Sequence, residues 1–225
     1  MRKERVAVKV KWLGHAAFVI TTADGTKILT DPYKPGGYDG AVGYGPITEK
    51  VDVVTVSHDH EDHNDTDGLT GSFEVVKGCG SSQAKGIRIQ GFGCFHDGSK
   101  GSERGDNTIF VIEADGIRVC HLGDLGHPLT AAEIKEIGRV DVLLVPVGGH
   151  FTIDAREAAQ VADAMRARVI IPMHFKTESL GFPIAPVDEF LNEMGIYERP
   201  ESSEVEITGE SLQEGKRVIV LEHAL

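Results

Sequence analysis

The chain has 225 residues, 40% of them hydrophobic and 26% charged, which is the composition of an ordinary soluble protein large enough to bury a sizeable core. Its 35 acidic residues outnumber the 23 basic ones, and the formal charge of -12 argues against nucleic acid or an anionic membrane as a partner. No apolar run approaches the roughly 20 residues of a membrane span, so we expect one soluble domain over residues 1–225.

The beginning of the chain predicts a meander of three strands. Val6–Trp12 alternates apolar and charged residues, as a half-buried strand does, and Ala16–Thr22 and Lys27–Thr30 follow it. A DG pair at residues 24–25 is a hairpin signal between the last two strands. The loop Tyr33–Pro46, rich in Gly, Pro and Tyr, is long enough to form a rim over a site.

Residues 51–64 read VDVVTVSHDHEDHN, a strand followed at once by a cluster of metal-capable side chains. The run 51–56 is apolar and β-branched, which predicts a buried strand. His58, His60, Asp62 and His63 come within six residues of one another. Imidazole nitrogens and a carboxylate oxygen are suited to zinc or another divalent transition metal.

The rest of the chain alternates short strands with three helices. A glycine-rich loop, GSKGSERGDN at residues 98–107, is expected to be mobile. Thr130 and Glu133 form a capping-box pattern that opens the first helix. Strands are predicted at 73–77, 87–95, 108–113, 117–120, 142–147, 169–171, 204–207 and 217–221, and helices at 131–137, 155–167 and 187–194.

Four predicted strands end in, or close to, a metal-capable residue, namely His58, His96, Asp124 and His174. Ligands at strand ends are held rigidly by the core while a metal can face solvent, as a catalytic site requires. A structural zinc site would more often use closely spaced cysteines.

The three cysteines, Cys79, Cys94 and Cys120, are odd in number and have no CxxC spacing. This pattern suits free thiols in a reducing compartment. Lys9 and Lys11 interrupt what would be the apolar core of a signal peptide. We therefore expect a cytoplasmic protein.

The H-x-H-x-D-H pattern at residues 58–63 resembles the signature of the metallo-β-lactamase superfamily, and His96, Asp124 and His174 follow in the order that superfamily uses. Further stretches, WLGHAAFVI, TDPY, CHLGD, PVGGHFT and PMHF, resemble its subgroup of small metal-dependent hydrolases that includes the ascorbate-6-phosphate lactonase-like proteins. The resemblance covers nearly the whole chain.

The resemblance implies an α/β fold, a four-layer αββα sandwich of two mixed β-sheets with helices outside. It also implies two divalent metal ions, with zinc preferred and manganese, nickel or iron as alternatives. His58, His60 and His96 would hold the first metal. Asp62, His63 and His174 would hold the second, and Asp124 would bridge both.

Redox-active di-iron members of the superfamily resemble H-x-E-x-D, with glutamate where this chain has His60, so the histidine favours hydrolysis. We expect a hydrolase that uses a dinuclear site and a metal-bound hydroxide on a small ester, lactone or phosphodiester. Asp62 would be catalytic, orienting the nucleophile and passing its proton to the leaving group. A non-catalytic metal-binding or sensor protein on the same scaffold is the alternative.

Other polar residues near the expected site are candidates for substrate contacts. His127 and His150 each follow a glycine near a strand end and could touch substrate or stabilise an oxyanion. Lys176, or Lys100 or Arg104 in the glycine-rich loop, could contact an anionic group of a small-molecule substrate. The roles of His15 and His121, the substrate and the oligomeric state stay open, a homo-oligomer included.

Overall fold

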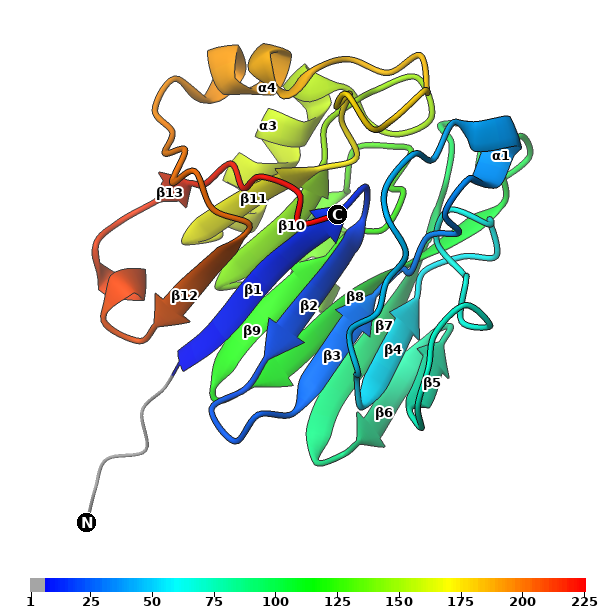
Figure 1. Ribbon diagram of the computed structural model, residues 1–225. Helices are drawn as coiled ribbons and strands as arrows, with labels where there is room; N and C mark the ends of the chain where they lie inside the picture. The colour runs from blue at the N-terminus through cyan, green and yellow to red at the C-terminus, as the bar shows by residue number, and fades with distance from the viewer. Residues whose placement is uncertain (1–6) are drawn as a thin grey trace.

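The computed structural model describes residues 7–225 and contains two mixed β-sheets packed face to face (Figure 1). Val6, the first residue of the predicted opening strand, lies outside the described residues. The first sheet consists of β1 (Ala7–Gly14), β2 (Ala17–Thr21), β3 (Lys27–Thr30), β4 (Val53–Val56), β5 (Glu74–Lys77) and β12 (Glu204–Thr208). Its order is β12-β1-β2-β3-β4-β5, antiparallel from β12 to β3 and parallel from β3 to β5.

The second sheet is made of the middle and late strands of the chain. These are β6 (Gly80–Ala84), β7 (Ile87–Phe95), β8 (Asp106–Ala114), β9 (Ile117–His121), β10 (Val142–Pro146), β11 (Val169–Met173) and β13 (Arg217–Val218). The order is β13-β11-β10-β9-β8-β7-β6. Strands β9, β10, β11 and β13 are parallel, whereas β6 to β9 form an antiparallel meander.

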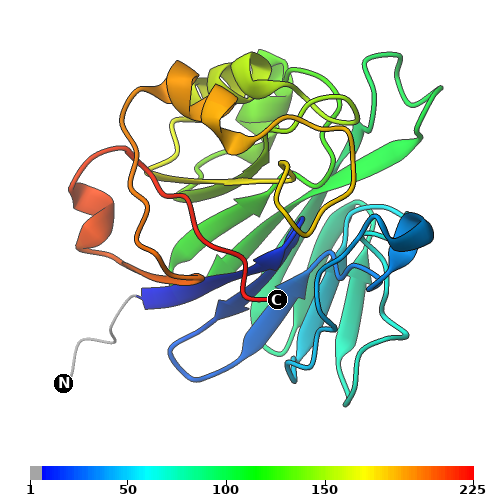
Figure 2. The same ribbon diagram turned by 45° about the horizontal axis from the view of Figure 1, so that its top comes forward.

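Three regular helices and two short turns complete the fold: α1 (Gly37–Gly40), α2 (Ala131–Ile137), α3 (Ala155–Met165), α4 (Val187–Met194) and a 3₁₀ turn at Ser211–Gln213. Helices α2 and α3 begin with capping boxes, Thr130 with Glu133 and Asp154 with Glu157, which satisfy N–H groups left free at a helix start. Helix α3 lies over β10, and α4 packs beside it (Figure 2).

Apolar side chains from both sheets fill the space between them and continue under α3 and α4, forming the main core. The outer face of the first sheet is covered by a second apolar cluster, to which the loop after β3 contributes Tyr33, Val42 and Tyr44 and the segment after β11 contributes Leu180 and Phe182. The predicted sandwich of two mixed sheets with helices outside is confirmed, with loops covering much of the first sheet.

Most predicted strands and helices are found within a few residues of their expected bounds, with three differences. Strand β6 was not predicted, because GSSQA lacks apolar periodicity and is held by pairing with β7. Strand β11 runs on through Pro172 to Met173. The last strand, expected at 217–221, pairs only at Arg217 and Val218 with β11.

The strand directions explain why one edge of the sandwich collects the metal-capable residues. Strands β9, β10 and β11 are parallel, and β7 is related to β9 by two antiparallel pairings, so all four run the same way. The segments after β7, β9 and β11 therefore leave the sheet at one end. His96, Asp124 and His174 lie in these segments.

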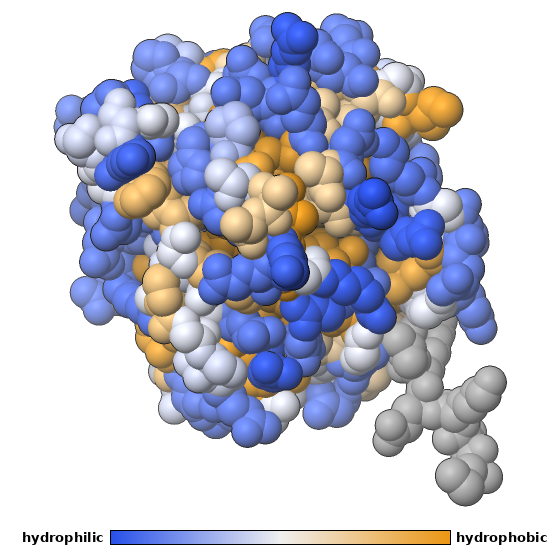
Figure 3. All heavy atoms as spheres, turned by 180° about the vertical axis from the view of Figure 1, so that it is seen from behind, coloured by the Kyte–Doolittle hydropathy of each residue, from blue (hydrophilic) through white to orange (hydrophobic). Residues whose placement is uncertain are grey.

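Hydrophilic side chains cover much of the face seen from behind, with smaller apolar areas between them (Figure 3). In the part of the chain from residue 7 onward, no helix is long and apolar enough to cross a membrane.

Candidate metal centre

The predicted metal ligands come together as two adjacent groups of donor atoms. His58, His60 and His96 form one group, and their ligand atoms lie within 4.8 Å of one another. A second group with the same spacing contains Asp62, His63 and His174, together with His15. A third set, Asp31, His58 and His63, overlaps both groups, and the assignment of the ligands to two metals stays a prediction.

Asp124 lies between the two groups. Its Oδ2 atom is 3.3 Å from His96 Nε2 and 3.2 Å from His174 Nε2, so it contacts one member of each group. It is also 3.3 Å from His63 Nε2. Asn107 holds the backbone of Asp124, since its Oδ1 accepts the Asp124 N–H at 3.1 Å. Asp124 therefore contacts both groups, and its role as a bridging ligand stays a prediction.

Asp31, at the end of β3, orients two of the imidazoles from behind. Its Oδ2 accepts the Ser57 hydroxyl at 2.5 Å and lies 2.9 Å from His63 Nδ1. The single hydroxyl proton of Ser57 is thus committed to Asp31, so His58 Nδ1, at 2.9 Å from Ser57 Oγ, must be the donor in that contact. Both histidines consequently carry a proton on Nδ1 and turn Nε2 toward the site, which is the arrangement of a metal-binding imidazole.

His15 supports the second group from the first hairpin. Its Nε2 is 3.0 Å from Asp62 Oδ2, and an ionised carboxylate can only accept, so His15 donates. Its ring also packs on His174, with centroids 4.2 Å apart. His15, Asp31 and His174 all have positive φ, at 52°, 40° and 51°. Such backbone strain in non-glycine residues is typical of functional sites.

His58 is neutral and Asp124 is ionised, as metal binding requires, whereas the carboxylates around His63 favour its protonated form until a cation displaces that proton. Burial lowers the pKa of His58 to about 3 and that of His15 to about 4, so their rings are neutral at pH 7. Burial acts to raise the pKa of Asp124, but His174 and His63 outweigh it and hold the carboxyl well below its ordinary range. His63, which burial would make less basic, has its pKa raised by Asp124 and Asp62.

Two observations show that these residues fit divalent cations. Buried donor atoms without a hydrogen-bond partner converge on the site: His58 Nε2, His63 Nε2, His174 Nε2, Asp62 Oδ1 and Asp124 Oδ1. An unsatisfied buried polar atom costs about 1–3 kcal/mol, so such a set is unfavourable without a ligand. In addition, no Lys or Arg between residues 7 and 225 pairs with Asp31, Asp62 or Asp124, which leaves their buried charge for a cation.

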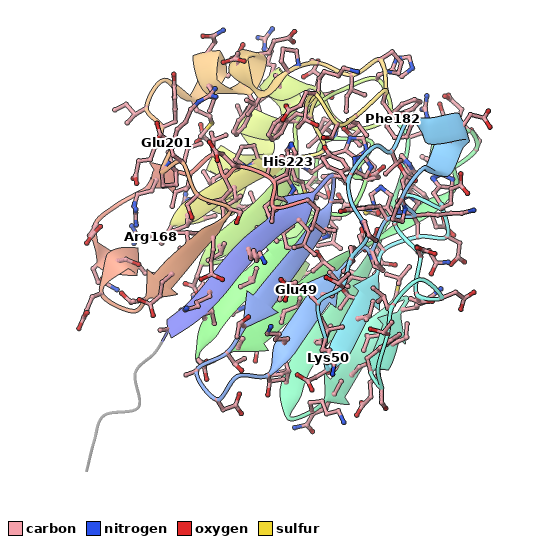
Figure 4. All side chains as sticks on the ribbon, viewed as in Figure 1. Glu49, Lys50, Arg168, Phe182, Glu201 and His223 are labelled. Atoms are coloured by element: carbon pink, nitrogen blue, oxygen red, sulfur yellow. The ribbon has the colours of Figure 1, made fainter. Side chains whose placement is uncertain are left out.

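A cleft of about 230 Å³ opens onto both groups. Its walls carry three aromatic rings, Tyr38, Phe151 and Phe182, and one cation, Arg104, whose guanidinium lies 5.7 Å from the centre of the Phe151 ring. Phe182 lies beside the α1 turn (Figure 4). The remaining lining residues are His60, Asp62, His96, Asp124 and His174. The cleft therefore offers metal donors on its floor and an apolar wall with one positive charge.

The loop that carries Arg104 is built around Asp97, directly after His96. The Asp97 carboxylate accepts the backbone N–H groups of Ser99, Gly101, Glu103 and Arg104 at 2.7–3.0 Å. Burial opposes ionisation of Asp97, but these hydrogen bonds outweigh it and lower its pKa to about 2. The glycine-rich loop, expected to be mobile, is therefore folded into turns tied to one side chain.

The predicted substrate contacts other than Arg104 do not line this cleft. The Lys176 ammonium binds the backbone carbonyls of Leu180 and Phe182. His127 Nε2 accepts the Phe95 N–H at 3.2 Å, outside the cleft. His150 is exposed and contacts the edge of the site only through the neighbouring ring of Phe151, with centroids 4.4 Å apart.

Sequence reasoning gave no role to Asp31, Ser57, Asn107 or Tyr38. A signal for Asp31 existed, because it directly follows the predicted strand Lys27–Thr30, as the four predicted strand-end ligands follow theirs. His121 was left open and proves to face inward, where its Nδ1 accepts the Gly123 N–H at 3.1 Å. Its Nε2 therefore carries the proton, which it donates to the Ala16 carbonyl at 2.9 Å.

Comparison with known proteins gives matches that span both sheets. The chain matches the β-lactamase superfamily domain over residues 9–174, a range that contains every predicted metal ligand. It is 31% identical to a UPF0173 metal-dependent hydrolase of Hyperthermus butylicus over 80% of this chain and 86% of that protein. A UPF0173 protein of Pyrococcus furiosus is 33% identical over 83% of this chain and 90% of its own.

Among solved structures, a proposed Zn-dependent hydrolase of the metallo-β-lactamase superfamily from Thermotoga maritima is similar with a TM-score of 0.77. It is 43% identical in sequence, and the match covers 95% of this chain and 98% of that one.

Proposed function

The chain belongs to the metallo-β-lactamase superfamily, among its metal-dependent hydrolases, and on this premise we propose that it hydrolyses a small anionic ester, lactone or phosphodiester with two divalent cations. The observation that carries the proposal is the position of Asp124 Oδ2, within 3.3 Å of both His96 and His174. One carboxylate between two three-residue donor groups is the ligand arrangement of a dinuclear centre.

The metals, zinc in our proposal, would act as Lewis acids and make water a nucleophile at neutral pH. The protein's own contribution begins with Asp62, which lines the cleft. His15 holds its Oδ2 atom and leaves Oδ1 without a partner. Asp62 is therefore suited to orient the attacking water and to carry its proton to the leaving group.

Substrate size and charge follow from the walls of the cleft. A volume of about 230 Å³ accommodates a small molecule or one end of a larger one. Arg104 is the one cation among the described lining residues, and its guanidinium is held over Phe151. A carboxylate or phosphate on the substrate would form charge-assisted hydrogen bonds with Arg104.

Free thiols at Cys79, Cys94 and Cys120 support our placing the enzyme in the cytoplasm.

Metal analysis combined with a substrate panel tests the proposal. We expect two equivalents of metal per chain after loading, and metal-dependent turnover within a panel of lactones, phosphodiesters and thioesters. His58→Ala should lose metal and turnover, whereas His223→Ala, which removes a histidine outside the donor groups, should keep both. Fewer than one equivalent, with no gain after addition of zinc or manganese, would contradict the dinuclear site. Full metal loading without turnover of any substrate would favour a metal-binding sensor instead.

A further inference from the structure

Tyr38 is presented to the cleft by an unusual turn of the backbone. Tyr38 and Asp39 have φ angles of 51° and 54°, and they lie between Gly36 and Gly40, which have φ angles of 75° and 90°. Left-handed backbone is unfavourable for a tyrosine, so the surrounding structure must hold it. The α1 turn is thus strained where it carries an aromatic side chain.

Glu61 provides one of the contacts that hold the turn. Its Oε1 accepts the Tyr38 N–H at 2.7 Å, its Oε2 lies 3.2 Å from the Lys34 ammonium, and its carbonyl accepts the Lys34 N–H at 2.9 Å. Glu61 stands between His60 and Asp62 in the metal-binding motif. The residue that separates two predicted ligands therefore also fixes Tyr38 over the site.

The segment after β11 holds the other side of the turn. The Gly181 N–H donates to the Ala41 carbonyl at 2.6 Å, and Phe182 packs edge-on against the Tyr38 ring with centroids 5.3 Å apart. Figure 4 shows Phe182 beside the α1 turn. Tyr38 is 43% exposed, so its ring is packed on one side and open to the cleft on the other.

The phenol is the only neutral hydroxyl among the described residues that line the cleft. It lines the same small cleft as the carboxylates of Asp62 and Asp124. These carboxylates can only accept hydrogen bonds, and the imidazoles beside them would turn lone pairs toward bound metals. Arg104, the other donor, comes from a different loop and carries a full charge. A substrate oxygen held above the donor groups would therefore meet one neutral donor, the Tyr38 hydroxyl.

We propose that Tyr38 is a catalytic residue that donates a hydrogen bond to the carbonyl or phosphoryl oxygen on which negative charge develops, and that Glu61 is its positioning residue. The phenol keeps its proton throughout, so no bond of Tyr38 is broken in the reaction. This inference rests on the proposed hydrolytic function. A donor aimed at developing charge accelerates acyl or phosphoryl transfer because its interaction strengthens in the transition state.

The test compares Tyr38→Phe with Tyr197→Phe, which removes the hydroxyl of an exposed tyrosine that packs against Arg199. We expect Tyr38→Phe to lower kcat about 100-fold, to change KM little and to keep the wild-type metal content. Tyr197→Phe should behave as wild type. Wild-type kcat in Tyr38→Phe, or a loss of kcat explained entirely by lost metal, would overturn the role of Tyr38.

Binding of inorganic phosphate to the zinc-loaded protein, measured by calorimetry, gives a readout that needs no turnover. Tyr38→Phe should weaken phosphate binding about tenfold, and unchanged binding would overturn the inference. If the wild-type protein hydrolyses nothing in the panel but phosphate binding still depends on Tyr38, the proposed function fails and the donor role stands.

Two substitutions test Glu61, one that keeps an acceptor oxygen for the Tyr38 N–H and one that removes it. Glu61→Gln keeps an oxygen for the Tyr38 N–H and should retain near-wild-type kcat, whereas Glu61→Ala should approach the kcat of Tyr38→Phe. The Tyr38→Phe, Glu61→Ala double variant should be no slower than Tyr38→Phe alone, because both changes remove the same interaction. Additive losses, or no rescue by glutamine, would overturn the positioning role.

Discussion

Asp31 Oδ2 lies 2.9 Å from His63 Nδ1, and both side chains are fully buried. Burial acts to raise the pKa of Asp31, but His121 and His63 outweigh it and keep the carboxyl ionised. The same oxygen accepts the Ser57 hydroxyl, and Oδ1 accepts the Ser57 N–H at 2.8 Å. One carboxylate thus determines the orientation of two predicted ligands on different metals, His63 directly and His58 through Ser57.

Asp31→Asn should lower metal affinity about 10–100-fold while leaving the fold intact. An amide has one acceptor oxygen, so either the Ser57 N–H or the pair of donors at Oδ2 would face an NH₂ group instead. Competition with a chromophoric chelator measures the affinity, and circular dichroism checks the fold. Asp67→Asn, at an exposed carboxylate, is the control. Unchanged affinity in Asp31→Asn would show that the imidazoles need no support from this residue.

Gly126 allows the segment after β9 to pass directly over His96. A Cβ atom at this position would lie 2.2 Å from the His96 carbonyl carbon and from the Asp97 nitrogen. Gly126→Ala should therefore push the two segments apart, destabilise the protein by about 2 kcal/mol or more and reduce metal content. Thermal unfolding and metal analysis measure these effects.

Gly98→Ala is a matched control, because nothing lies within 4 Å of its added Cβ and its φ is in the ordinary range. We expect it to unfold like wild type. Equal effects of the two substitutions would mean that loss of glycine flexibility, rather than the close approach to His96, controls stability here.

The predicted ligands could be found from the sequence because each depends on a local pattern, a strand that ends close to a metal-capable residue. The supporting residues depend on pairing that the sequence does not reveal. Asp31 reaches His63 only because β3 and β4 are parallel neighbours. Tyr38 reaches the cleft only because Glu61 and Phe182, distant in sequence, hold a strained turn. Lys176 is the opposite case. It is close to His174 in sequence, but its ammonium binds the Leu180 carbonyl and does not line the cleft.

Arg104→Ala should discriminate against anionic substrates. Loss of a charge-assisted hydrogen bond, worth about 1.5–3 kcal/mol, should lower kcat/KM for an anionic ester about 10–100-fold and leave a neutral ester of the same size nearly unchanged. Lys100→Ala, in the same loop but exposed, is the control. An equal loss for both esters would indicate that Arg104 supports the cleft wall through Phe151 rather than binding the substrate.

Asp97→Asn should loosen the loop 98–105. The wild-type carboxylate accepts four backbone N–H groups, and an amide cannot accept all four. We expect trypsin to cleave after Lys100 and Arg104 faster in this variant, with Asp106→Asn as the control. Equal cleavage rates would show that other contacts order the loop.

The same carboxylate gives the loop a defined dependence on pH. Its pKa is depressed from 3.8 to about 2, so its contribution is complete above about pH 4 and is lost as the pH falls through about 2. Hydrogen-exchange protection of residues 99–104 should therefore persist at pH 3. Loss of protection near pH 4 would contradict the role of Asp97.

The three cysteines should differ sharply in reactivity. Cys79 is exposed, whereas burial raises the pKa of Cys94 to about 12 and also raises that of Cys120. Because the thiolate is the reactive form, an aromatic disulfide reagent should modify one thiol per native chain and three after denaturation. Cys79→Ser should abolish the native reaction.

Modification of Cys94 in the native protein would contradict this expectation. The Cys94 sulfur contacts Asn107 Nδ2 at 3.1 Å, and Asn107 holds the backbone of Asp124. Such modification would show that the region behind the predicted bridging ligand opens to solvent.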